Sequence, residues 1–369
     1  MTEIFLIIFF ISVLLFFLGS GIWVAISMIG VSTIGMMLFT SRPVGDAMAT
    51  TIWGTSSSWT LTALPLFVWM GEILFRTKLS ENLFAGLSPW MQKLPGGLIH
   101  VNVVGCALFA AISGSSAATV ATVGKMSIPE LRKRKYPEKI LLGSLAGSGT
   151  LGLLIPPSII LIIYGVTVQE SIAKLFIAGI IPGIMIALIF MSYVMIWSLI
   201  NKKSMPKYVE NFSFLEKIRK SKQLLPVIIL ISAVIGSIYT GVATATEAAS
   251  LGVVGALILS YFQKSLTIET FKQSLLGATK TSCMIAFILA GSTFLSLAMG
   301  FTGLPRNLAI WIQNMELSPY VLIFVLMIFY IILGMFLDGI SAVVLTMAII
   351  EPMIRQAGFD MIWFGIFLV

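Results

Sequence analysis

The chain has 369 residues, of which 58% are hydrophobic and only 10% are charged, and its mean hydropathy is +1.04. This composition excludes a soluble globular protein and indicates an all-α polytopic membrane protein in a lipid bilayer. The net charge of +8 does not indicate nucleic acid as a partner, because Lys and Arg in a membrane protein mostly mark the cytoplasmic loops.

Apolar windows long enough to cross a bilayer recur along the whole chain. A hydrocarbon core of ~30 Å requires about 20 apolar residues per helix, and roughly ten windows qualify. They lie near 3–18, 21–39, 59–75, 98–124, 141–165, 171–200, 224–241, 242–262, 276–300 and 318–350.

Basic clusters between these windows predict the orientation of the chain. They lie at 132–135, 202–207, 219–222 and 264–272, and such loops are expected to face the cytoplasm. Counting back from them places the N-terminus in the periplasm. All these loops share one side only if the window 98–124 enters and leaves on the same face, which predicts a re-entrant hairpin.

The centre of window 98–124 is small and polar, which agrees with a hairpin. Ser113, Gly114, Ser115 and Ser116 would form its tip. Serine hydroxyls supply neutral oxygen ligands near the membrane midplane without the cost of a buried charge. The alternative is a straight helix whose small residues form a packing seam.

The next window, 141–165, is broken by glycines and by Pro156 and Pro157. Proline lacks an N–H group and cannot continue a regular helix, so carbonyls one turn earlier lose their partners. At membrane depth such groups are tolerated only where they are buried in protein or line a cavity. Discontinuous helices of this kind hold ions or small polar solutes in secondary transporters.

An ionisable residue begins the window 242–262. Glu247 follows Thr244 by three residues. An acidic residue inside the membrane is costly, so a functional role is the first hypothesis, and here that role would be ion coupling. A glutamate near the start of a helix can instead cap the helix and be stabilised by the helix dipole. Both interpretations stay open.

A second polar interruption lies at 337–342 and resembles 112–117 at an offset of 225 residues, which pairs Gly114 with Gly339 and Ser116 with Ser341. Internal repeats, often inverted, build many transporters, with sites at the repeat interface. The offset predicts a second hairpin at about 338–353. It also places the counterpart of the broken helix at 374–383, so we expect the C-terminal end, at Val369, to be truncated.

Two other function classes compete with a secondary transporter. An enzyme needs a nucleophile with a base or a metal cluster, but the chain has one histidine and two cysteines without CxxC spacing, so no enzyme and no transition-metal site are expected. A channel needs a pore-lining filter, usually from symmetric subunits, whereas broken helices in two related halves favour alternating access.

These segments together resemble the large membrane subunit of the tripartite ATP-independent periplasmic (TRAP) transporters, the DctM-like family. The resemblance spans nearly the whole chain and is carried by 64–72, 113–119, 125–131, 147–158, 241–249 and 337–341. It implies an inverted-repeat, elevator-type importer in which a transport domain with two re-entrant hairpins slides against a scaffold domain. The corresponding divisions are scaffold helices and arm at 1–97, the first transport repeat at 98–200, a second scaffold and arm at 201–275, and an incomplete second transport repeat at 276–369.

The resemblance also implies a function, a site and partners. The function is import of an organic anion, such as a C4-dicarboxylate or sialic acid, across the bacterial inner membrane, with sodium as coupling ion and no other cofactor. The alternative is another Na⁺- or H⁺-coupled anion transporter that works without a binding protein. The partners are a small four-helix membrane subunit and a periplasmic substrate-binding protein. The sodium and substrate residues are Ser113, Gly114, Ser115, Ser116, Gly149, Gly152, Ile155 and Pro156 in the first half and Asp338, Gly339 and Ser341 in the second.

Overall fold

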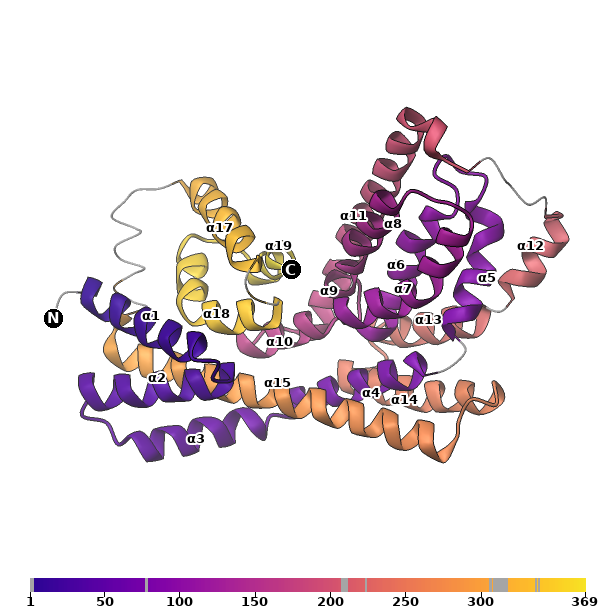
Figure 1. Ribbon diagram of the computed structural model, residues 1–369. Coiled ribbons are helices and arrows are strands. Elements are labelled where there is room, and N and C mark those ends of the chain that lie inside the picture. Colours follow the sequence, from indigo (N-terminus) through magenta and orange to yellow (C-terminus); the bar gives the residue numbers. More distant parts are fainter. Residues whose placement is uncertain are drawn as a thin grey trace. The chain divides into compact units, whose positions relative to one another are not determined.

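The computed structural model describes residues 3–76, 79–206, 212–222, 224–304, 307, 318–335, 337 and 339–369, and all regular structure in these parts is helical (Figure 1). Contacts divide the chain into two compact units. The first unit comprises 1–61, 162–171 and 281–369, and the second comprises 62–161 and 172–280. The scaffold and transport boundaries at 97, 200 and 275 stay a prediction.

The second unit contains the helices around the predicted first hairpin. In it α6, α7 and α8 pack against one another, and α4 lies along α14 (Figure 1). Its elements are α4 (Ala63–Phe75), α5 (Leu79–Met91), α6 (Ile99–Ser113), α7 (Ser116–Lys133), α8 (Glu138–Gly149), α9 (Leu151–Leu154), α11 (Ile172–Ile200), η2 (Lys202–Ser204), α12 (Phe214–Ser221), α13 (Leu225–Tyr239) and α14 (Ala245–Phe262).

The first unit contains both ends of the chain. In it α1 packs on α2, and α18 packs on both α17 and α19. Its helices are α1 (Glu3–Gly19), α2 (Val24–Phe39), α3 (Val44–Ser56), α17 (Pro319–Gly334), α18 (Gly339–Gln356) and α19 (Met361–Leu368). The segment η1 (Trp59–Thr62) and the helices α10 (Ile159–Thr167) and α15 (Ile268–Thr302) contribute residues to both units.

Several helix starts follow from local sequence. Ser115, Thr244, Ser318 and Asp360 are the N-cap residues of α7, α14, α17 and α19, and each side chain accepts a hydrogen bond from a backbone N–H group of the first turn. These bonds satisfy donors that have no partner inside the helix.

The helices confirm a membrane protein of several spans. Within the described residues α11, α14, α15 and α18 are long and apolar enough to cross a bilayer, and up to seven spans result if each of three bent helix pairs counts as one. The helices α2, α6 and α17 are apolar but shorter. Large apolar side chains such as Ile181, Leu188 and Ile196 on α11 are exposed, as expected for residues that face lipid.

Candidate functional site

The predicted hairpin tip lies between two helices of the second unit. α6 ends at Ser113 and α7 begins at Ser116, so only Gly114 and Ser115 connect them. Gly114 has φ +57°, in the left-handed region where a side chain is disfavoured. The second helix extends beyond the end of the predicted window 98–124, because α7 continues as far as Lys133.

Oxygen atoms converge at this tip. The Ser113 and Thr119 hydroxyl oxygens lie 2.9 Å apart. Both hydroxyls approach the Ser115 carbonyl oxygen, at 3.3 Å from Ser113 Oγ and 2.7 Å from Thr119 Oγ1. Both side chains are buried, and none of these three atoms comes from a carboxylate. Each of the two hydroxyl oxygens also has lone pairs, so it can accept as well as donate a hydrogen bond.

The broken helix lies directly against the tip. α8 ends at Gly149, the short α9 that follows it ends at Leu154, and α10 begins at Ile159; the four residues between α9 and α10 are not helical. The Ile159 N–H donates to the Gly114 carbonyl oxygen at 3.2 Å, and the Ser158 hydroxyl donates to the Leu153 carbonyl. Two backbone groups freed by the break thus find partners inside the protein, as membrane burial requires.

Glycines allow this close approach. A Cβ atom on Gly152 would lie 2.8 Å from the Ser115 carbonyl oxygen, and one on Gly114 would lie 2.7 Å from the Pro157 carbonyl oxygen. Both neighbours are backbone atoms, which cannot move as a side chain can. The tip and the break therefore fit together only because both positions lack a side chain.

The other predicted residues of the first half occupy different surroundings. Gly149 lies against Val120 of α7, one turn beyond the tip. Ile155 packs with the core cluster of Val103, Ala110 and Leu151. The structure thus brings Ser113, Gly114, Ser115, Ser116, Gly149 and Gly152 together, whereas Ile155 and Pro156 lie near α11.

Three glycines that the sequence analysis did not single out complete the surroundings. A Cβ atom added to Gly179 of α11 would lie 2.8 Å from the Leu154 carbonyl oxygen, and one added to Gly183 would lie 2.8 Å from Ile155 Cγ1. A Cβ atom added to Gly71 of α4 would lie 3.1 Å from the Ile112 carbonyl oxygen. The four-residue spacing of Gly179 and Gly183 in an apolar window is a known signal for close helix packing, and it was available in the sequence.

Thr119 was also missing from the predicted site, although it is a fully buried residue whose hydroxyl belongs to the tip cluster. It follows Ser116 by three residues on α7, so the helix period places both on similar faces. That periodicity was the available signal.

The second half is described in part. Asp338 lies outside the described residues. Gly339 is the first residue of α18, and Ser341 is buried in its first turn. As in the first half, the small polar motif thus lies where a helix begins.

Thr244 and Glu247 form a capping box at the start of α14. The Glu247 carboxylate accepts from the Thr244 N–H and from the Thr244 hydroxyl, both at 2.8 Å, and the Glu247 N–H donates to that hydroxyl at 3.3 Å. This geometry explains a glutamate at this position by helix capping.

Comparison with known proteins identifies the family. The family model "Tripartite ATP-independent periplasmic transporter, DctM component" matches residues 10–369. The chain belongs to this family.

Individual relatives agree with the family match. The chain is 32% identical over 335 residues to the C4-dicarboxylate TRAP transporter large permease protein DctM of Pseudomonas aeruginosa, covering 90% of this chain and 78% of that protein. It is 29% identical over 357 residues to the isethionate TRAP transporter permease protein DctMQ of Oleidesulfovibrio alaskensis, and this match covers 96% of this chain and 55% of that protein. It is 30% identical over 355 residues to the sialic acid TRAP transporter large permease protein SiaM of Vibrio cholerae, and this match covers 95% of this chain and 82% of that protein. All three relatives are named as permeases, which fits the expectation of a non-enzyme.

Proposed function

We propose that this TRAP permease imports an organic anion across the bacterial inner membrane, that sodium ions drive the import, and that the hairpin tip and the broken helix form the first sodium site. The observation that carries the proposal is the buried oxygen cluster of Ser113, Thr119 and the Ser115 carbonyl against the helix break.

The chemistry of the cluster suits sodium. Na⁺ is a hard cation that takes oxygen ligands, and hydroxyls with unwound carbonyls supply them without a second buried charge. The Gly152 position supports this proposal, because the absence of a side chain leaves the Ser115 carbonyl accessible from the broken helix. In the second half, Asp338, Gly339 and Ser341 are the proposed counterparts.

An anionic substrate is supported by the helix start beside the cluster. α7 begins at Ser116, and the N-terminus of a helix favours negative charge through its free N–H groups and its dipole. The relatives' names point the same way, because C4-dicarboxylates, isethionate and sialic acid are organic anions. We therefore propose a carboxylate or related anion as substrate.

The proposed assembly follows the family. It includes a small membrane subunit and a periplasmic substrate-binding protein, and the basic loops of this chain would face the cytoplasm with the N-terminus in the periplasm. The alternative, an anion transporter that works without a binding protein, is not favoured, because the named relatives are TRAP permeases.

The test is uptake by the complete assembly in proteoliposomes. The assembly would be supplied with succinate, isethionate or N-acetylneuraminate, with its binding protein, and with an inward gradient of either Na⁺ or K⁺. We expect uptake of at least one anion under the Na⁺ gradient only. Equal uptake under K⁺ would refute sodium coupling, and equal uptake without the binding protein would favour the alternative.

A further inference from the structure

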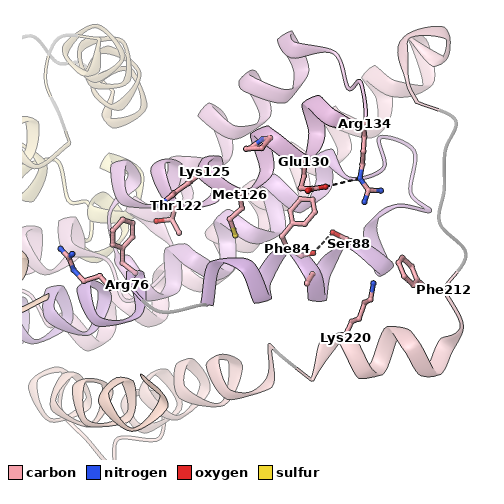
Figure 2. Close-up of a pocket in the computed structure, with 13 residues that line it drawn as sticks. Arg76, Phe84, Ser88, Thr122, Lys125, Met126, Glu130, Arg134, Phe212 and Lys220 are labelled. Carbon is pink, nitrogen blue, oxygen red and sulfur yellow. Dashed lines mark hydrogen bonds and ion pairs between the residues drawn. The ribbon is translucent and has the colours of Figure 1, made fainter. Parts of the chain in front are cut away.

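A cavity of about 830 Å³, lined by both polar and apolar side chains, lies within the second unit, on the part of α7 that follows the hairpin tip (Figure 2). Its walls come from the end of α4, from α5 and from α7, and the segment around α12 supplies Phe212 and Lys220. The Trp90 indole N–H of α5 donates to the Ser221 hydroxyl of α12 at 2.7 Å and ties these two walls together. We call this cavity the α5–α7–α12 chamber; its volume is typical of sites for small molecules.

The charge of the chamber is mainly positive. Arg76, Lys125, Arg134 and Lys220 line it, and Glu130 is the acidic lining residue. Glu130 pairs with Arg134 at 3.7 Å, and the Lys220 ammonium lies 3.9 Å from the centre of the Phe212 ring. Lys125 is exposed and forms no ion pair within the described residues.

A buried hydroxyl in the chamber wall has no partner. Thr122 is only 3% exposed, and its Oγ1 atom makes no hydrogen bond to any described residue. A buried polar group without a partner is costly, so such groups in native proteins call for an explanation. A ligand acceptor atom in the chamber would satisfy this hydroxyl.

The chamber lies beside the proposed sodium site. Thr119, Thr122 and Lys125 follow one another at intervals of three on α7, so they form a continuous stripe on neighbouring faces of the helix. Each step advances about 4.5 Å along the axis. Thr122 and Lys125, which line the chamber, therefore lie one and two such steps beyond Thr119.

We propose that the α5–α7–α12 chamber is a binding site for the carboxylate group of the transported anion, one helical turn along α7 from the hairpin tip. The Thr122 hydroxyl donates to a carboxylate oxygen, and Lys125 supplies the neutralising charge. This inference rests on the proposed function, since it assumes that the substrate is a carboxylated solute.

The test is ligand-induced stabilisation of the purified full chain in detergent. Succinate and N-acetylneuraminate are titrated separately, with their uncharged methyl esters as controls, and an apparent Kd is taken from the shift in Tm. We expect at least one acid to raise Tm and its ester not to. Thr122→Val and Lys125→Gln should each weaken the apparent Kd about tenfold or more, because each loses a hydrogen bond or a charge that contacts an ion.

Matched variants distinguish binding from folding. Thr122→Ser keeps the hydroxyl and should bind like the wild type. Thr293→Val, in a separate cavity of the first unit, and Lys139→Gln, on the exposed surface of α8, should also leave the apparent Kd unchanged. The Tm of each variant without ligand reports whether it folds.

Three outcomes overturn the assignment. Wild-type protein that neither acid stabilises shows that the chamber is not a carboxylate site. An unchanged apparent Kd in both Thr122→Val and Lys125→Gln shows that the acid binds elsewhere. Stabilisation by phosphatidylglycerol micelles, and by neither acid, assigns the chamber to a lipid headgroup. None of these results bears on sodium-driven uptake, which the proteoliposome assay measures separately.

Discussion

The hydroxyl oxygens of Ser113 and Thr119 lie 2.9 Å apart across the turn between α6 and α7. They are six positions apart in sequence, and the left-handed Gly114 reverses the chain between them. A two-residue turn thus brings the last residue of one helix and the first turn of the next to a single point, where the Ser115 carbonyl joins them.

Contact between the tip and the broken helix depends on Gly152. In Gly152→Ala the new methyl group would lie within 3.0 Å of three backbone atoms of Ser115 and Ser116. We expect a loss of about 1–3 kcal/mol in stability, as for other overpacked sites, together with a loss of sodium-dependent transport. Thermal unfolding in detergent and uptake by the assembly measure the two effects.

Gly143→Ala is the matched control on α8. A Cβ atom there meets nothing within 4 Å. Replacing glycine by alanine in a helix interior should raise stability by about 0.5–1 kcal/mol and leave transport intact. If Gly152→Ala and Gly143→Ala have equal stability and equal transport activity, the tip and the break are not in contact.

A substitution at Glu247 distinguishes a capping role of this residue from an ion-coupling role. Glu247→Gln keeps an acceptor oxygen for the Thr244 N–H and removes the negative charge. If the residue is a cap, transport by this variant should keep the sodium dependence of the wild type, with at most a small drop in Tm. A changed sodium concentration dependence of uptake at an unaltered Tm would instead assign ion coupling to Glu247.

Tyr164 links α10 to α19 within the first unit. Its buried hydroxyl donates to the Met361 carbonyl oxygen at 2.6 Å. Tyr164→Phe removes this bond and keeps the ring, so we expect a loss of about 1 kcal/mol in unfolding free energy. Thr279→Val is a suitable control, because its hydroxyl bonds only within its own helix on an exposed face. If Tyr164→Phe loses no more unfolding free energy than Thr279→Val does, the hydrogen bond from Tyr164 to Met361 does not stabilise the first unit.

Local stereochemistry made part of the site predictable. Ser113–Ser116 interrupt an apolar run with small polar residues, and Pro156 and Pro157 cannot continue a helix, so both breaks follow from the sequence alone. The same holds for the Thr244 cap of α14, whose capping pattern is local.

Two other features could not be predicted in this way: the glycines that approach the site from other helices, and the position where α7 ends. Gly71 and Gly179 approach the site from helices that are distant in sequence, and which backbone atoms they meet depends on packing. The predicted hairpin ended at 124 because hydropathy falls there, whereas α7 continues through Pro129 to the basic residues at its end. Hydropathy reports the membrane boundary and not the end of the helix.

The most direct test of the central claim is thermal unfolding of the full chain in NaCl, KCl and choline chloride at equal ionic strength. A ligand that binds only the folded state stabilises it by about 2.7 kcal/mol at a hundredfold excess over Kd. Ser113→Ala and Thr119→Val remove the two clustered hydroxyls, and Ser250→Ala removes an exposed hydroxyl on α14 as a control. We predict a rise in Tm that is specific to sodium, lost in the first two variants and retained in the third. Equal Tm values in the three salts, or a sodium-specific rise that persists in both tip variants, would contradict a sodium site at the hairpin tip.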